Sequence, residues 1–184
     1  PMALRGAVKV KEGKPTHSVD NQDEIKKLFP NTYGLPLISF EPGETMLRKR
    51  VNVGVILSGG QAPGGHNVIS GLFDRLKQLD PENRLYGFLM GPSGLVDHNY
   101  KEITADFVEQ FRNTGGFDMI GSGRTKLEEV DQFEKGMEII RKLDIQALVI
   151  IGGDDSNTNA CMLAEYYAAK KYGCLLYTSD AADE

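Results

Sequence analysis

The chain has 184 residues and a net charge of −5 at pH 7, with 40% hydrophobic and 26% charged residues. This is the composition of a soluble globular protein that can bury one good core but is short for a two-domain enzyme. The acidic balance argues against a nucleic-acid surface. The lack of a signal peptide, of a long apolar run and of a zinc-type cysteine set favours a cytoplasmic protein over a membrane or secreted one.

The first 50 residues differ in pattern from the rest of the chain. They lack sustained periodicity and contain recurring prolines, so we expect an N-terminal extension that wraps a domain, with one short helix over residues 22–29. From residue 51 a β-branched run predicts a strand over 51–57. The glycine-rich segment Ser58–Gly65 follows, and then a helix over 67–79.

The rest of the chain continues this alternation of strands and helices. We expect a strand over 84–90, a helix over 104–112 capped by Thr104, a short strand over 117–120, an amphipathic helix over 131–142, a strand over 145–151 and a helix over 157–172. Strand, glycine-bearing loop and helix thus recur, which is typical of an α/β protein with a doubly wound parallel sheet. Cys161 falls where the last helix should face a core, so we expect a buried thiol there.

Three glycine-bearing loops follow predicted strands, at Ser58–Gly65, Gly121–Lys126 and Gly152–Thr158. The loops after parallel strands cluster at the carboxyl edge of a sheet, so we expect these three to form one site. The first loop offers backbone N–H groups around Gly59 and Gly60, but it lacks the lysine of a Walker-type loop and does not match Gly-x-Gly-x-x-Gly. Its glycines are equally compatible with tight packing between strand and helix.

The second and third loops carry charges suited to phosphate chemistry. Arg124 is a fork-shaped donor for phosphate oxygens, with Lys126 beside it, although a loop arginine can also be merely exposed. Asp154 and Asp155 stand together at the mouth of a helix, where capping needs one carboxylate and Ser156 could already supply a cap oxygen. Two adjacent carboxylates repel each other, so we expect a divalent cation such as Mg²⁺ that bridges them to phosphates.

The histidines give no catalytic constellation. His66 follows the first loop and is expected to be a polar residue at a helix start rather than a base. His17 and His98 have no usable partners in the sequence, and no Ser/His/Asp or Cys/His set emerges. The charged loops and the acidic pair therefore carry the predicted chemistry.

Three segments, in this order, resemble the phosphofructokinases: Val53–Asn67, Gly115–Lys126 and Gly152–Ala160. They are most similar to the pyrophosphate-dependent branch in its long form, which includes the catalytic β subunit of the plant enzyme. The likeness extends to Glu24–Gly34, so it covers residues 20–174, and three independent motifs in order make it specific.

The resemblance implies reversible, Mg²⁺-dependent transfer of a phosphoryl group from pyrophosphate to fructose 6-phosphate, a kinase reaction of glycolysis and gluconeogenesis. It implies that Gly59 contacts the donor phosphate through its backbone, that Asp154 positions Mg²⁺, and that Arg124 faces the transferring phosphates. ATP-using relatives have glycine at position 155, so Asp155 is expected to place bulk and charge where the α-phosphate of ATP would lie. Arg124 and Asp155 are the candidate catalytic residues, and pyrophosphate is further expected to contact Gly60, Lys126, Ser156 and Asn157.

The resemblance divides the chain into an N-terminal extension (1–50), a partial pyrophosphate-binding domain (51–174) and a tail (175–184). The family's catalytic base lies in a Pro-Lys-Thr-x-Asp-x-Asp segment, expected shortly after Cys174. The tail found there matches nothing in the family and looks like translated vector sequence, although a genuine alternative end or a frameshift would also produce one. We therefore expect an N-terminal fragment that is inactive by itself, with the activity belonging to a longer parent.

Other interpretations stay open. An ATP-dependent phosphofructokinase, or a related kinase of NAD or lipids, would share the Gly-Gly-Asp loop. Asp155 and the segment 157–159 disfavour both alternatives. A non-catalytic regulatory subunit would bind phosphorylated ligands, but such subunits tend to lose the acidic pair. By resemblance the parent is a homo- or hetero-oligomer and an allosteric enzyme, with the regulatory segments outside this sequence.

Overall fold

The computed structural model describes residues 6–44 and 50–180, and the chain forms two compact units, Pro1–Lys49 and Arg50–Glu184. In the first unit, strand β1 (Val8–Pro15) pairs antiparallel with β2 (Pro36–Pro42), and helix α1 (Gln22–Leu28) lies between them in sequence. The short helix expected in this region is confirmed. The two strands were missing from the sequence prediction because nearly all their residues are exposed, so no buried face marks them.

The second unit contains a five-stranded sheet in the order β5-β4-β3-β6-β7. Its strands are β3 (Asn52–Leu57), β4 (Leu85–Phe88), β5 (Tyr100–Glu102), β6 (Ile145–Gly152) and β7 (Leu175–Asp180). Strands β4, β3, β6 and β7 run parallel, whereas the short edge strand β5 is antiparallel to β4. The predicted α/β fold with a doubly wound parallel sheet is thus confirmed, with one antiparallel edge strand.

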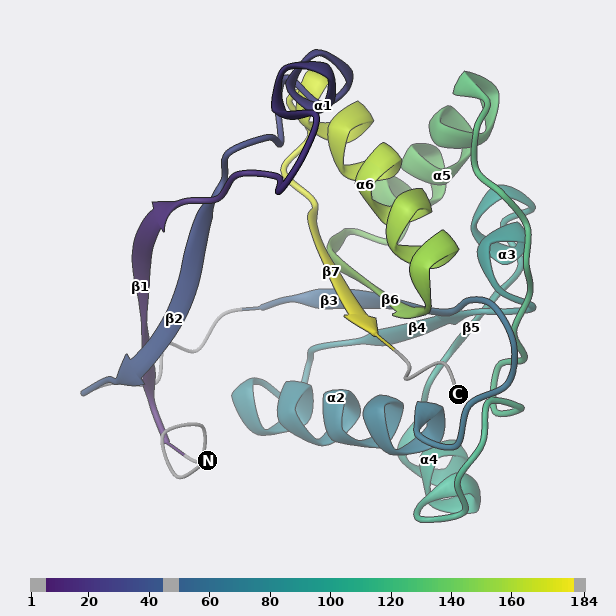
Figure 1. The fold of residues 1–184 in the computed structure, drawn as a ribbon. Helices are drawn as coiled ribbons and strands as arrows, with labels where there is room; N and C mark the ends of the chain where they lie inside the picture. The colour runs from purple at the N-terminus through teal and green to yellow at the C-terminus, as the bar shows by residue number, and fades with distance from the viewer. Residues whose placement is uncertain (1–5, 45–49, 181–184) are drawn as a thin grey trace. The chain divides into compact units, whose positions relative to one another are not determined.

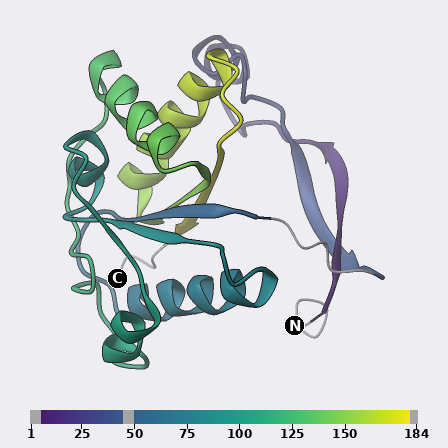
Figure 2. The same cartoon turned by 180° about the vertical axis from the view of Figure 1, so that it is seen from behind.

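Helices cover both faces of this sheet (Figures 1 and 2). Those of the second unit are α2 (Gly65–Leu79), α3 (Pro92–Val96), α4 (Ala105–Phe111), α5 (Val130–Lys142) and α6 (Asp154–Ala169). Helices α2 and α4 pack on one face, and α3, α5 and α6 pack on the other. Along β3, Ile56 joins the core under α5 and α6, while Val55 and Leu57 join the core under α2, as the alternation of side chains in a strand requires.

Most helix predictions hold, and the cap of α4 is the one foreseen. The Thr104 side chain accepts a hydrogen bond from the backbone N–H of Phe107 at 3.4 Å. Helix α6 begins at Asp154, three residues before the predicted start at Asn157, so both aspartates lie in its first turn.

The strand predicted over residues 117–120 is wrong, because these residues form a turn. Phe117, Met119 and Ile120 are nonetheless buried, and the backbone N–H of Met119 donates to Nε2 of His66 at 3.0 Å instead of joining a sheet. Only Gly123, further along, forms a single bridge with Ser58 within the described residues. The apolar pattern correctly indicated burial, but burial does not require strand pairing.

The prediction of a buried Cys161 is also wrong, because its side chain is exposed. The core face of α6 includes Asn159, Ala160, Leu163 and Tyr167. Successive residues on a helix are rotated by about 100°, so Cys161, one residue after Ala160, points away from the core. The sulfur is still partly covered, and this burial raises the pKa of the Cys161 thiol.

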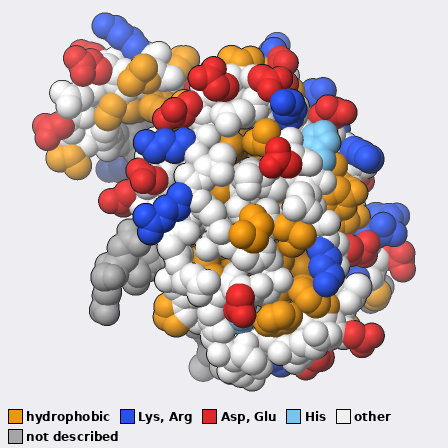
Figure 3. All heavy atoms as spheres, turned by 90° about the vertical axis from the view of Figure 1, so that its right-hand side faces the viewer, with side chains coloured by type: hydrophobic (Ala, Val, Ile, Leu, Met, Phe, Trp, Pro, Cys, Tyr) orange, Lys and Arg blue, Asp and Glu red, His pale blue; other side chains and the backbone are white. Residues whose placement is uncertain are grey.

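The surface carries charges of both signs. On the face turned to the viewer in Figure 3, Lys and Arg side chains are interspersed with Asp and Glu side chains and with hydrophobic ones. Among the described residues, no helix combines the length and the apolar character needed to cross a membrane. Of the predicted tail (175–184), residues 175–180 form β7, and residues 181–184 lie outside the described residues.

Candidate active site

The centre of the sheet is a topological switch point. Strand β3 lies between β4 and β6, and the connections from β3 and β6 lead to helices on opposite faces, α2 and α6. In such a sheet a crevice opens between the loops at the carboxyl ends of the two strands. Here the crevice is closed at its base, where the N–H of Ser58 donates to the carbonyl of Ile151 at 2.7 Å.

A cavity of about 680 Å³ opens at this edge of the sheet. Its lining comes from all three predicted loops and from α6: Ser58, Gly59, Gly60, Gln61, Ala62, Arg124, Lys126, Gly152, Gly153, Asp154, Asp155, Ser156 and Asn159. The structure therefore brings together every predicted site residue except Asn157. The Asn157 side chain instead donates to the carbonyl of Gly153 at 3.0 Å, within its own helix.

The first loop turns sharply at Gly59, whose φ of 93° lies in the left-handed region that favours glycine. The N–H of Gly59 donates to the carbonyl of Gly123 at 2.9 Å, so this amide is occupied within the protein. The N–H of Gly60 has no hydrogen-bond partner in the part of the chain that the structure describes. The Gly60 amide is thus available to an anion, and within the described residues the N–H groups of Gln61 and Ala62, which also line the cavity, have no partner either.

The third loop ends at the open N-terminus of α6. Gly153 is its N-cap and supplies no side-chain cap, so the cap oxygen expected from Ser156 is not used in that way. Ser156 is buried, and its hydroxyl donates to Oγ of Ser58 at 2.8 Å, which ties α6 to the end of β3. Asp154 and Asp155 are exposed at the cavity, beside first-turn amides that have no intrahelical partner.

The second loop adds two cations to the lining of the cavity that the acidic pair also lines. Arg124 and Lys126 are exposed, and neither forms an ion pair with another described residue. Arg124 reaches toward the first loop, since a methyl group added at Gly60 would come within 3.2 Å of Arg124 Nη2. Cationic side chains, a bare amide and a helix N-terminus on one cavity can hold phosphate groups.

The acidic pair fits a metal that is shared with a ligand. Within the described residues, no group of three or more His, Cys, Asp or Glu side chains could hold a metal ion by itself. Mg²⁺, however, is commonly bound by one or two carboxylates together with water and substrate phosphates. Asp154 and Asp155 have this donor chemistry, in a cavity that also carries phosphate-binding groups.

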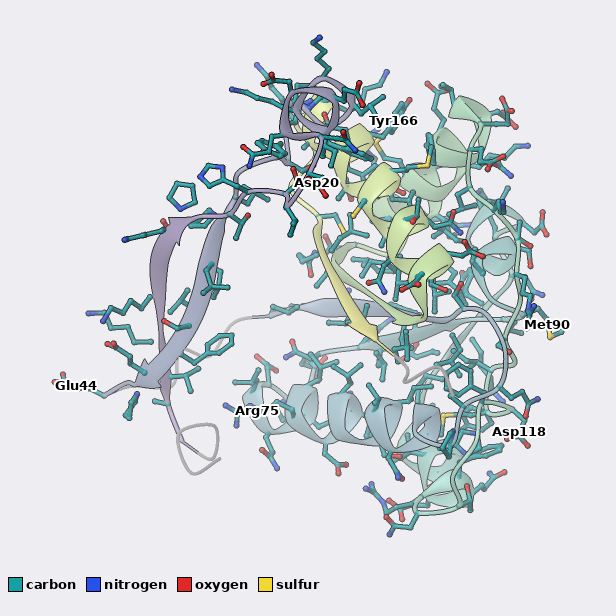
Figure 4. The ribbon with its side chains drawn as sticks, in the orientation of Figure 1. Asp20, Glu44, Arg75, Met90, Asp118 and Tyr166 are labelled. Carbon is teal, nitrogen blue, oxygen red and sulfur yellow. The ribbon has the colours of Figure 1, made fainter. Side chains whose placement is uncertain are left out.

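Two residues make contacts that were not predicted, Asn159 at the cavity and His66 at the start of α2. Asn159, one turn after Asp155, bonds to the second loop through both atoms of its side-chain amide. His66 is the second residue of α2, as expected of a helix-start residue, but it is almost fully buried. It contacts Thr114, Met119 and Asp118, and Figure 4 shows Asp118 at the end of α2 opposite Arg75. Both contact sets join segments distant in sequence, so no local pattern reveals them.

A doubly wound sheet whose glycine loops, cations and acidic helix start meet in one cavity is the arrangement of a phosphate-handling α/β protein. The sequence profile of the family described as phosphofructokinase matches residues 52–179. The chain therefore belongs to the phosphofructokinase family, as its motifs predicted.

Individual relatives and solved structures show which members of the family are similar to this chain. Over 170 residues the chain is 67% identical to the pyrophosphate–fructose 6-phosphate 1-phosphotransferase of Porphyromonas gingivalis, covering 92% of this chain and 31% of that protein. Over 172 residues it is 50% identical to subunit beta 1 of the Arabidopsis thaliana enzyme of that name, covering 92% of this chain and 30% of that one. The chain thus spans less than a third of these curated relatives. A crystal structure of Pichia pastoris phosphofructokinase in the T-state matches with a TM-score of 0.63 at 22% identity, over 76% of this chain and 16% of that one, which supports the fold.

Proposed function

We propose that a protein containing this chain transfers a phosphoryl group from pyrophosphate to fructose 6-phosphate, and that this chain supplies the pyrophosphate side of the active site. The names of the Porphyromonas gingivalis and Arabidopsis thaliana relatives support this reaction. In it, the P–O bond to the bridging oxygen of pyrophosphate breaks, and the sugar hydroxyl oxygen bonds to the transferred phosphorus. The hydroxyl proton passes to a base that we expect from another segment, and phosphate leaves.

The residues of the cavity contribute positioning and charge compensation, which supply most of the catalysis in phosphoryl transfer. Arg124 and Lys126 bind phosphate oxygens, together with the free amide of Gly60 and the N-terminus of α6. Asp154 would hold Mg²⁺, with Asp155 beside it. When bound, the ion neutralises negative charge on the donor.

The observation that carries the choice of donor is the position of Asp155. Asp155 lines the cavity in the first turn of α6, and it directly follows Asp154, the carboxylate proposed to hold Mg²⁺. A donor with a third phosphate would bring further negative charge against this carboxylate. Like charges about 4 Å apart near a protein surface repel each other by up to roughly 4 kcal/mol, which disfavours ATP relative to a smaller donor. Pyrophosphate, with two phosphates, avoids the conflict.

The test is the Asp155→Gly variant, in the chain joined to the remainder of the Porphyromonas gingivalis relative. We expect the ratio of ATP-supported to pyrophosphate-supported turnover to rise at least about tenfold, because bulk and charge are both removed. Asp155→Asn serves as the matched control, since it keeps the bulk and removes the charge. An unchanged ratio in a variant that still uses pyrophosphate would refute the proposed role of Asp155.

The regulatory-subunit interpretation makes a different prediction for the same chimera. If this segment only binds phosphorylated ligands, the chimera folds and binds magnesium pyrophosphate without turnover. The preserved acidic pair favours the catalytic interpretation, because a purely regulatory site has no need of a metal-binding carboxylate. The oligomeric parent, the cytoplasmic location, the allosteric control and the foreign origin of residues 175–184 stay predictions.

A further inference from the structure

Asn159 makes an unusual pair of contacts for a side chain at the edge of the cavity. It lies on the second turn of α6 and is 8% exposed. Its Nδ2 donates to the carbonyl of Thr125 at 3.2 Å, and its Oδ1 accepts from the N–H of Leu127 at 3.2 Å. A residue in a parallel strand bonds to its neighbour in this way, accepting from one residue and donating to another two positions away. The side-chain amide thus pairs with the backbone around Lys126.

This pairing completes a series of backbone anchors along the second loop. The carbonyl of Gly123 is held by the N–H of Gly59, and the Thr125 carbonyl and the Leu127 amide are held by Asn159. Between these two, the Lys126 carbonyl accepts from Nε2 of Gln132 at 3.3 Å. The two cationic side chains, Arg124 and Lys126, alternate with these anchors and line the cavity. Alternating residues of a non-helical segment can present their side chains to the same side. The anchors therefore determine where the two charges lie.

We propose that Asn159 is a positioning residue that holds the Arg124–Lys126 segment at a fixed distance from the carboxylates at the start of α6. One helix carries both the acidic pair and Asn159, one turn apart, so the cations are held in register with the anions across the cavity. Where it concerns pyrophosphate, the inference rests on the proposed function. Without the amide, the protein binds the two phosphates with a displaced pair of cations.

The first experiment needs no ligand. Hydrogen exchange at the Leu127 amide is measured in the 184-residue chain by NMR or mass spectrometry. The Asn159→Ala variant should exchange this amide about tenfold faster, because its acceptor is gone. Tyr166→Phe is the matched control, since it removes another side-chain tie of α6, the 3.0 Å bond to Glu134, far from the loop (Figure 4). Unchanged exchange at Leu127 in Asn159→Ala overturns the inference.

A second variant covers the case in which Asn159→Ala does not fold. Asn159→Asp retains an acceptor for the Leu127 amide but loses the donor to Thr125, and it places a carboxylate oxygen beside that carbonyl. The Leu127 amide should stay protected in this variant, whereas magnesium pyrophosphate should bind more weakly than to the unmodified chain. If Asn159→Asp binds magnesium pyrophosphate as tightly as the unmodified chain does, the amide donor has no positioning role.

The last experiment tests whether Asn159 acts through the cations. Affinity for magnesium pyrophosphate is measured by calorimetry for Asn159→Ala, alone and combined with Arg124→Ala and Lys126→Ala. We expect about a tenfold loss in the original background, since small displacements of binding groups are costly. With both cations removed the further loss should be less than about twofold, because coupled residues are not additive. Equal losses in both backgrounds overturn the inference. If the unmodified chain does not bind the probe, the proposal that this chain supplies the pyrophosphate side of the active site fails, and the exchange experiment still decides the role of Asn159.

Discussion

The starts of α2 and α6 are two versions of the same structural position. Both helices follow neighbouring parallel strands at the centre of the sheet, and the loops that precede them line one cavity. The start of α2 is closed by the protein, because the N–H of His66 donates to the carbonyl of Gly116 at 3.0 Å and the first turn has no acidic residue. The start of α6 is open and carries Asp154 and Asp155 in its first turn.

This difference shows which of the two helix starts faces the cavity. On the α2 side, backbone amides without a partner among the described residues belong to the loop, as at Gly60, and the helix itself is packed against the turn at residues 116–119. On the α6 side the helix N-terminus and its carboxylates face the cavity directly. The same backbone topology therefore presents backbone amides to the cavity on one side and a helix N-terminus with two carboxylates on the other.

Removal of the first carboxylate at the open helix start should have the largest effect. Asp154→Asn keeps the shape of the side chain but weakens its hold on Mg²⁺, so pyrophosphate-dependent turnover of the chimera should fall about a hundred- to a thousandfold. The control is Asn67→Ala, an exposed residue in the first turn of α2 that does not line the cavity, and it should leave turnover unchanged. Full activity of Asp154→Asn in saturating Mg²⁺ would contradict the assignment of this carboxylate.

A methyl group at the closed helix start should destabilise the fold. An added Cβ at Gly65 would collide with the Phe117 ring and would lie 2.9 Å from the Gly116 carbonyl oxygen. Gly65→Ala should thus lower the free energy of unfolding by about 3 kcal/mol, the upper range for overpacking. Gly64→Ala is the matched control, because a Cβ there meets nothing within 4 Å, and its effect should stay within about 0.5 kcal/mol. Urea unfolding of the chain measures both, and equal stabilities would show that the α2 start is not tightly packed.

Magnesium should decide whether pyrophosphate stabilises the chain. At a hundred times its Kd, a ligand that binds only the folded state adds about 2.7 kcal/mol of stability. We expect this gain for pyrophosphate with Mg²⁺, and little or none after chelation of the metal, since Asp154 and Asp155 then repel the bare anion. Thermal unfolding with and without a chelator gives the comparison. Equal stabilisation in both conditions would mean that the bound anion lies away from the α6 start.

The convergence of the first and third loops was predictable because it follows from topology. Apolar runs identified β3 and β6, and the carboxyl ends of parallel strands share an edge, so Gly60 and Asp154 had to come close. The second loop was expected there for the wrong reason, because no strand precedes it, and it reaches the cavity through the contacts of Gly123 with Ser58 and Gly59. The sequence placed Asp154 and Asp155 at the mouth of a helix, but it predicted the helix start at Asn157, so their position inside the first turn was not foreseen.

What escaped prediction depends on contacts across long sequence separations. The bonds of Asn159 to Thr125 and Leu127 span more than thirty positions, and no periodicity encodes them. The turn at 117–120 was mistaken for a strand because hydrophobic spacing reports burial, and the partner of its amide at Met119 is a side chain, His66. Such side-chain partners appear only once the elements are packed.

The buried serines of α6 and α2 give the smallest and most specific test of the two helix starts. Ser156 donates across the site to Ser58 at 2.8 Å, whereas Ser70 donates to the carbonyl of His66 at 2.8 Å, inside its own helix. Ser156→Ala should lower the free energy of unfolding by about 1 kcal/mol, because the buried hydroxyl of Ser58 loses its hydrogen-bond donor. Ser70→Ala should cost less, since a back-bond within a helix leaves the carbonyl with its normal partner. A larger loss for Ser70→Ala would mean that the α2 start, rather than the Ser156–Ser58 tie at α6, holds the cavity in shape.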